Sequence, residues 1–293
     1  MVTAAQRRQA VGHLQKTFHV SERRACRVLG QPRATQRQQP RAREAEGRLV
    51  ARMLELVRQH PRYGYRRIGM LLRREGWRLN RKRVYRLWRQ QGLKVPRKQR
   101  KKRRLGSSAN GCVRRPAEFK DHVWSWDFLH DRTVTGGALK WFTLIDEYTR
   151  ECLALEVRRG MPARVVRDVL APVVQQRGTP VHIRSDNGPE FIAVAIRAWM
   201  AEVGVATLYI APGSPWENGD AESFNSKVRD ELLNVEEFAS VLEAQALGKA
   251  WKAAYNQDRP HSALGYQTPG EFGASCPRAD SAPLRSASPR TRR

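Results

Sequence analysis

The segment HVWSWDFLHD, residues 122–131, decides how the second part of the chain folds. Its residues alternate, so that Val123, Ser125 and Asp127 fall on one side of an extended chain and three aromatic residues on the other. This period of two is typical of a β-strand. A carboxylate inside such a strand is costly to bury unless something binds it. Asp127 is therefore a candidate functional residue, with a solvated position at a sheet edge as the alternative.

Further strands and helices are predicted on both sides of a mixed sheet. Two strand-like runs follow the first one directly and predict an antiparallel meander. Amphipathic helices and short apolar runs then alternate, which is typical of parallel crossovers. The order βββαβαβα predicts an α/β fold. The runs are ALKWFTLIDEYTR (138–150), ECLALEV (151–157), a helix in MPARVVRDVLAPVVQQRG (161–178), PVHIRSD (180–186), a helix near 189–203, and VATLYI (205–210).

The segment APGSPWENGDAESFNSKVRDEL, residues 211–232, predicts a helix that begins near Pro215. Its polar residues recur at helical spacing on one face, and these are Asn218, Glu222, Asn225 and Arg229. Phe224, Val228 and Leu232 occupy the opposite face and predict the side that packs on the core.

The positive charge of the chain is concentrated in its first part. The formal net charge is +27, and residues 1–118 carry 34 Lys and Arg against 6 Asp and Glu. Residues 119–293 carry 21 against 22, so the second part is almost neutral. A surface of this kind favours a polyanion, and nucleic acid is the expected partner, with an anionic membrane surface as the weaker alternative.

Two segments of this basic part have the pattern of a helix-turn-helix. In residues 6–30, Ser21 is placed to cap the second helix and Gly30 to end it. In residues 62–93, Gly76 ends the first helix and Asn80 is the expected cap of the next.

The last of these helices has one cationic face. Lys82, Arg86 and Arg89 fall on it, opposite a face formed by Val84, Leu87, Trp88 and Gln91. A solvated charged face is the alternative to contact with DNA phosphates. The residues expected to contact nucleic acid are Arg66, Arg67, Lys82, Arg83, Arg86, Arg89, Asn218, Asn225 and Arg229.

Composition shifts divide the chain into five parts. These are a helix-turn-helix-like segment (1–50), a second helix-turn-helix domain (51–95), a basic linker (96–118), the α/β core with its C-terminal extension (119–273) and a tail expected to be disordered (274–293). The four cysteines lie far apart without a C-x-x-C pair, which favours neither a zinc site nor disulfides. No apolar run is long enough for a membrane span, so a cytoplasmic protein without a membrane partner is expected.

Asp186 follows a predicted strand, and the carboxyl ends of strands are where α/β folds place their sites. The alternative is a turn, because Asp-Asn-Gly is strong turn chemistry. Thirty-five residues separate Asp186 from Glu222.

These motifs resemble a known family. SWDF (125–128), SDNGPEF (185–191) and SPWENGDAESFNSKVRDEL (214–232) resemble the D, D(35)E motifs of the DDE transposase and retroviral integrase superfamily. More narrowly, residues 63–87 and YNQDRPHSALGYQTPGEF (255–272) resemble the OrfB transposases of bacterial insertion sequences of the IS-three family. The likeness spans about residues 7–273.

The resemblance implies a ribonuclease H-like integrase core in which Asp127, Asp186 and Glu222 are the catalytic and metal-binding acids. It implies a DNA transposase that binds the terminal inverted repeats of its element, cleaves their 3′ ends and joins them to target DNA. Hard carboxylate ligands suit Mg²⁺ or Mn²⁺, and two ions are expected. The weaker candidates for a place among the three acids are Glu217, Asp131 and Asp146.

The same resemblance implies binding partners, and two alternative functions remain open. Double-stranded DNA, an upstream OrfA product or a fusion with it, and further copies of the chain in a synaptic complex at the nucleoid are expected. The rivals are a DNA-binding protein without catalysis and a metal-dependent ribonuclease H-like nuclease. In the C-terminal extension, Tyr255, Arg259 and His261 either contact DNA or form a rigid turn that caps the core.

Overall fold

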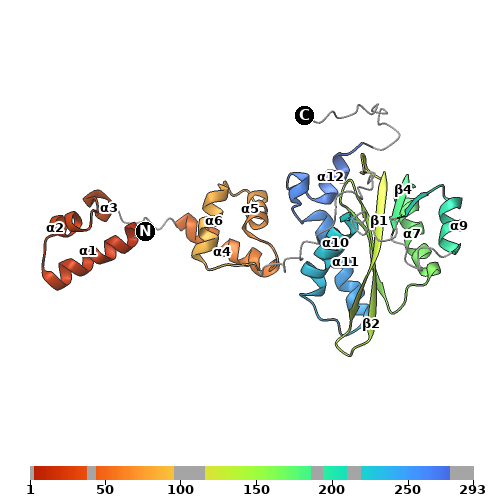
Figure 1. Cartoon of the computed structure of the whole chain (residues 1–293), viewed down its shortest axis with the longest axis horizontal. Coiled ribbons are helices and arrows are strands. Elements are labelled where there is room, and N and C mark those ends of the chain that lie inside the picture. Colours follow the sequence, from red (N-terminus) through yellow and green to blue (C-terminus); the bar gives the residue numbers. More distant parts are fainter. Residues whose placement is uncertain (1–2, 38–43, 96–115, 186–193, 210–218, 278–293) are drawn as a thin grey trace, which may run out of the picture. The chain divides into compact units, whose positions relative to one another are not determined.

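The computed structural model describes residues 3–37, 44–95, 116–185, 194–209 and 219–277 (Figure 1). The chain divides into two compact units, residues 1–58 and 59–293.

The first unit consists of helices. They are α1 (Ala4–Phe18), α2 (Glu22–Val28), α3 (Arg33–Arg37) and α4 (Glu44–Gln59), whose last residue belongs to the second unit. The Ser21 side chain accepts a hydrogen bond from the backbone of α2, and Gly30 follows that helix with φ of 59°. The first helix-turn-helix pattern thus gives the expected pair of helices. The boundary expected between residues 50 and 51 falls inside α4, because its helical pattern continues without a break.

The second unit begins with α5 (Tyr65–Arg74) and α6 (Arg81–Gln90). Asn80 caps α6 by accepting from the backbone N–H of Lys82, and Gly76 has φ of 90° between the helices. The apolar face of α6 is buried as predicted, through Val84, Leu87 and Trp88. Gln91, predicted on that face, is exposed instead, because the helix ends one residue earlier.

A five-stranded mixed sheet forms the centre of the second unit. Its order is β3-β2-β1-β4-β5, in which β1–β2 and β2–β3 pair antiparallel while β1–β4 and β4–β5 pair parallel. The predicted meander and the two parallel crossovers are therefore confirmed. The strands are β1 (Val123–Arg132), β2 (Ala138–Asp146), β3 (Cys152–Arg158), β4 (His182–Ser185) and β5 (Ala206–Tyr209).

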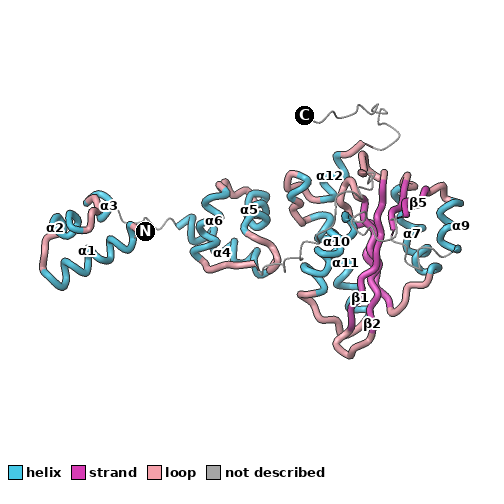
Figure 2. Tube along the Cα trace, viewed as in Figure 1, coloured by secondary structure: helices cyan, strands magenta, loops and turns pink. Residues whose placement is uncertain are grey.

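Helices cover both faces of this sheet, as Figures 1 and 2 show. One face packs on α7 (Ala163–Arg177) and α9 (Val194–Glu202) through a core that includes Trp124 and Trp126 of β1. The other face packs on α10 (Gly219–Val228), the π-helix η3 (Arg229–Leu233) and α11 (Val241–Gln257). The short helix η4 (Ser262–Leu264) and α12 (Pro269–Ser275) follow.

The predicted α/β class is confirmed. Because the residues of β1 alternate, its side chains pack into the cores on both faces of the sheet. Its aromatic residues fill the core on the α7 side, whereas Leu129 belongs to the core on the α10 side. Asp127 faces the side of Leu129, because side chains two residues apart share a face. The expected starts of the helices near residues 189 and 215 lie outside the described residues. In the described part of the chain, no helix combines the length and the apolar character that crossing a membrane requires.

Candidate active site

Asp127 lies in the middle of β1, the central strand, and its side chain is half-buried. Its Oδ1 accepts a hydrogen bond from the backbone N–H of Phe128 at 2.7 Å. Its Oδ2 accepts from Nδ2 of Asn225 at 2.7 Å. The carboxylate is thus satisfied by donors on both oxygens, which answers how a carboxylate is accommodated inside the strand.

Asn225 is buried between α10 and the sheet, with 5% of its surface exposed. The hydroxyl of Thr143 lies 2.9 Å from Oδ1 of Asn225 and 3.0 Å from the backbone carbonyl of Asp127. Thr143 is the cross-strand partner of Asp127 on β2. Because a hydroxyl donates to the amide oxygen, the amide nitrogen faces the carboxylate, which only accepts. The three side chains form one network across β2, β1 and α10.

Glu222 lies on α10 one turn before Asn225, and its side chain is exposed. Residues three apart lie on the same face of a helix, so Glu222 and Asn225 share the polar face predicted from the sequence. Asn225, however, is buried together with the apolar residues Phe224, Val228 and, in η3, Leu232. The apolar residues hold α10 on the sheet, and Glu222 lies on the exposed part of the same helix.

A buried ion pair fixes the neighbouring strand β4. Nε of Arg184 donates to Oε1 of Glu147 at 2.9 Å, and the hydroxyl of Ser125 donates to the same carboxylate oxygen. Ser125 and Arg184 are register partners on β1 and β4. Their side chains, like that of Glu147, are at most 5% exposed. The network therefore locks β1 against β4 two residues before Asp127 in one strand, and Asp186 follows two residues after Arg184 in the sequence.

Asp186 and Asn218 lie outside the described residues, as do the expected start of the helix at Pro215 and the alternative acid Glu217. Among the residues that the structure describes, no group of three or more His, Cys, Asp or Glu side chains has the geometry of a metal site. Asp127 and Glu222 do fit divalent metal chemistry, because their carboxylate oxygens are the hard ligands that Mg²⁺ and Mn²⁺ prefer.

Two alternative acids have structural roles. Asp146 is fully buried, and its oxygens accept from the backbone of Asp121 and Tyr148 and from the hydroxyl of Thr149. Burial raises the pKa of Asp146 to about 6, although these donors oppose the shift. Asp131 accepts from the backbone N–H of Arg132. Asp146 thus organises the turn after β2, which agrees with the structural role that the sequence favoured for it.

Comparison with known proteins identifies the family. Two family profiles described as integrase core domain match residues 118–215 and 203–269, and one described as HTH-like domain matches residues 44–102. The uncharacterized 31.7 kDa protein of insertion element IS407 from Burkholderia multivorans is 37% identical over 261 residues, which cover 89% of this chain and 93% of that protein. The transposase InsD of an IS2 element from Escherichia coli is 30% identical over 238 residues, with 76% and 77% covered. The chain belongs to the insertion-sequence transposases.

For this transposase the predicted fold class is confirmed as a ribonuclease H-like integrase core preceded by helical helix-turn-helix segments, and the family makes it an enzyme of the polynucleotidyl-transferase type. The HTH-like match begins at residue 44, where α4 begins. The structure of the integrase catalytic core domain of HTLV-2, in complex with magnesium, is also similar. It has 16% identity and a TM-score of 0.44, over 54% of this chain and 99% of that domain.

Most cations predicted to contact DNA are displayed by the second helix-turn-helix of the transposase. Lys82, Arg86 and Arg89 are exposed on α6, and Arg83 is half-buried. Arg66 is exposed on α5, where its guanidinium lies 5.8 Å from the ring centroid of Tyr65. Arg229 is exposed at the start of η3.

Two of the residues predicted to contact DNA bond to protein groups in the structure. Asn225 is buried and bonded to Asp127, because a carboxylate inside the sheet needs a donor. Arg67 donates to Glu231 at 3.1 Å. The spacing of polar residues along the helix singled out Asn225. It did not show that the Asn225 side chain is buried against the sheet.

The C-terminal extension of the transposase forms a rigid turn against the core. Arg259 is 1% exposed and donates from Nε and Nη2 to the two oxygens of Glu231, at 2.7 Å and 2.6 Å. Tyr255 and His261 are also buried. The extension therefore forms a cap on the core, which is one of the two interpretations of its sequence. The ion pair with Glu231 was not predicted, because no local pattern links residues that far apart.

Proposed function

We propose that this chain is a DNA transposase that binds the terminal inverted repeats of an insertion sequence, cleaves their 3′ ends and transfers them to target DNA. The observation that supports this most directly is the hydrogen bond from Asn225 to Asp127. It joins the helix that carries Glu222 to the strand that carries Asp127. This link supports the proposal that the carboxylates of Asp127 and Glu222 act at one site.

The catalytic residues proposed are Asp127, Asp186 and Glu222. Asp186 follows Ser185, the last residue of β4, and β4 pairs with β1 beside the position of Asp127. The fixed network of Ser125, Glu147 and Arg184 supports this arrangement, because it sets the register of the two strands. The three carboxylates would bind two divalent ions, Mg²⁺ or Mn²⁺, which when bound activate the attacking oxygen and stabilise the leaving oxygen.

The reaction is proposed to have two steps with the same chemistry. In the first, a water oxygen bonds to the phosphorus at the element end, and the bond from that phosphorus to the 3′ oxygen breaks, which releases a 3′-hydroxyl. In the second, this hydroxyl attacks a target phosphodiester, and the target strand leaves with its own 3′-hydroxyl. The carboxylates would position the reacting phosphate through the divalent ions that they hold, and no covalent protein intermediate is required.

DNA recognition is proposed for α6, whose cations are exposed on one face while the other packs inward. A capped helix with such a face is the arrangement that helix-turn-helix proteins place in the major groove. The basic segment 96–118, most of which lies outside the described residues, adds charge for the DNA backbone. An upstream OrfA product, as partner or fusion, and at least a dimer at the nucleoid would complete the synapsis of two ends.

The proposal is tested with labelled DNA that carries the element ends, in Mg²⁺, with and without the fused upstream partner. We expect wild-type protein to give cleaved and joined strands, and Glu222→Gln to bind the DNA but give neither. Glu236→Gln, at an exposed position after η3, is the matched control and should react like wild type.

Equal activity of wild type and Glu222→Gln would show that the acids are wrongly assigned. Cleavage without joined strands in both partner states would favour the ribonuclease H-like nuclease. Binding without any reaction would favour the DNA-binding protein without catalysis.

A further inference from the structure

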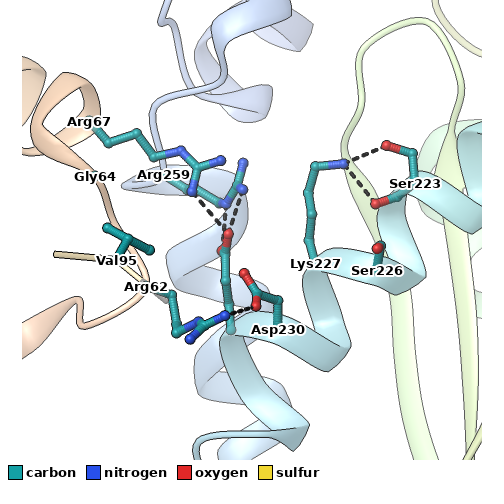
Figure 3. A pocket seen from close by; sticks show the side chains of 10 residues that line it. Arg62, Gly64, Arg67, Val95, Ser223, Ser226, Lys227, Asp230 and Arg259 are labelled. Carbon is teal, nitrogen blue, oxygen red and sulfur yellow. Dashed lines mark hydrogen bonds and ion pairs between the residues drawn. The ribbon is translucent and has the colours of Figure 1, made fainter. Parts of the chain in front are cut away.

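A pocket of about 400 Å³ lies beside the helix that carries Glu222 (Figure 3). One wall is formed by α10 and η3, and the other by residues around the start of α5 and by Arg259 of the C-terminal extension. Ser223 and Ser226, which follow Glu222 directly and one turn later, are part of the first wall. The pocket is therefore adjacent, along α10, to the proposed catalytic residue Glu222.

Positive charge predominates among the described residues that line this pocket. Arg62, Arg67, Lys227 and Arg259 are cationic, whereas Asp230 and Glu231 are the anionic members. Two hydroxyls, of Ser223 and Ser226, add neutral donors. A concave surface with more cations than carboxylates favours an anion, and the favourable interaction strengthens where water is excluded.

The carboxylates fix the guanidinium groups in place. Glu231 accepts two hydrogen bonds from Arg259, which is 1% exposed, and one from Arg67. Asp230 pairs with Arg62, whose Nε is buried and has no hydrogen-bond partner among the described residues. Arginine planes held in this way are preorganised for an incoming phosphate, because less side-chain entropy is lost on binding.

Lys227 lies across the opening from these arginines. Its Nζ donates to the backbone carbonyl and to the hydroxyl of Ser223, at 2.9 Å each. In the view of Figure 3, Lys227 stands between Ser223 and the guanidinium groups of Arg67 and Arg259. An acceptor placed between them meets cationic donors from both walls.

We propose that this pocket binds a backbone phosphate of the DNA strand that passes through the active site. This proposal rests on the proposed function. The volume suits a group of nucleotide size and not a duplex, so the strand would enter through one phosphate and its sugar. A phosphate contact carries no base sequence and instead sets the position of the strand. The pocket thus fixes which phosphodiester lies at Glu222.

The test uses the full-length protein, in the partner state that binds DNA, and duplexes that carry the element ends. Single phosphates near the 3′ end are replaced in turn by uncharged methylphosphonates. We compare wild type, Lys227→Gln and the matched control Lys249→Gln, which is exposed on α11. Affinity is measured over a range of salt concentrations, and the cleavage position is read on a sequencing gel.

We expect Lys227→Gln to weaken binding several-fold and to reduce the slope of log affinity against log salt by about 1, as for one lost phosphate contact. One methylphosphonate position should weaken wild type and the control but leave Lys227→Gln unaffected. The cleavage position should become less uniform in Lys227→Gln only.

The proposal is overturned if every methylphosphonate weakens wild type and Lys227→Gln equally, since the two changes would then be independent. The methylphosphonates alter only the DNA, so this result does not depend on how the variant folds. Failure of the proposed function looks different: Glu222→Gln would then cleave and join like wild type, whatever Lys227→Gln does to binding.

Discussion

Asn225 on α10 donates a hydrogen bond to Asp127 on β1 over 2.7 Å, and Thr143 fixes the amide that donates it. This contact links the helix of Glu222 to the carboxylate of the central strand. If Asp127 is catalytic as proposed, we expect Asn225 to be a positioning residue, since a carboxylate held by two donors keeps one orientation.

Replacing Asn225 by alanine removes this donor and leaves the Thr143 hydroxyl without its amide partner. We expect the yield of joined strands to fall about 10- to 100-fold, and the free energy of unfolding to fall by about 1–3 kcal/mol. DNA affinity should be retained. Asn234→Ala, at an exposed position after η3, is the control. Normal strand transfer by Asn225→Ala in a folded protein would refute the positioning role.

The exposed cations of α6 are expected to bind DNA phosphates. The double substitution Arg86→Gln with Arg89→Gln should weaken binding and lower the slope of log affinity against log salt by about 2. The control is Arg164→Gln with Arg167→Gln, two exposed arginines on α7. Gel-shift titrations at several salt concentrations measure both pairs, and an equal loss in the two pairs would show that general charge, not α6, governs binding.

Arg259 and Glu231 form an ion pair whose side chains are 1% and 7% exposed. Arg259→Ala leaves the Glu231 carboxylate buried with one guanidinium fewer, so we expect a loss of about 3–5 kcal/mol in unfolding free energy. Arg74 and Glu271, with side chains 32% and 50% exposed, form the comparison pair. Arg74→Ala should cost less than about 1 kcal/mol. Chemical denaturation measures both, and similar losses would contradict the role of burial.

Burial, together with the positive charge of Arg259, lowers the pKa of His261 to about 3. The ordinary pKa of a histidine is 6.5, so between pH 6.5 and about pH 3 this side chain is protonated in the unfolded chain but not in the folded chain. The free energy of unfolding is therefore unaffected by this histidine above pH 6.5. It falls as the pH is lowered from 6.5 toward 3, by up to about 1.4 kcal/mol per pH unit.

His261→Gln has no titrating group at this position, so its unfolding free energy should fall less than that of wild type on acidification. Denaturant titrations across this pH range provide the comparison, with His130→Gln at an exposed position as the control. A wild-type profile that parallels that of His261→Gln would mean that His261 does not couple folding to protons.

The sheet and most helices could be predicted from the sequence, because their signals are local. The alternation around Trp124 and Trp126 gives β1, and Ser21 and Asn80 cap their helices as expected. These signals depend on residues within a few positions of one another, where backbone geometry dictates the pattern.

The role of Asn225 could not be predicted in the same way. A helical period shows that Asn225 shares a face with Glu222, but its burial depends on a strand almost a hundred residues earlier. The pairing of Arg67 and Arg259 with Glu231 is equally non-local. An arginine that faces a carboxylate and one that faces a phosphate have the same local sequence signature, so only the fold separates them.

The order of the elements along the chain has a consequence for protein synthesis. Asp127 leaves the ribosome early, on a strand that stays without its parallel neighbour until β4 is made. Asn225 and Glu222 follow only with α10, and Arg259, which anchors η3, emerges later still. A chain whose translation stops before α10 has the first acid but neither Glu222 nor the amide of Asn225 that bonds to Asp127. If the proposed acids carry the reaction, a product that ends before α10 would lack one of them and would not cut the chromosome of the cell that makes it.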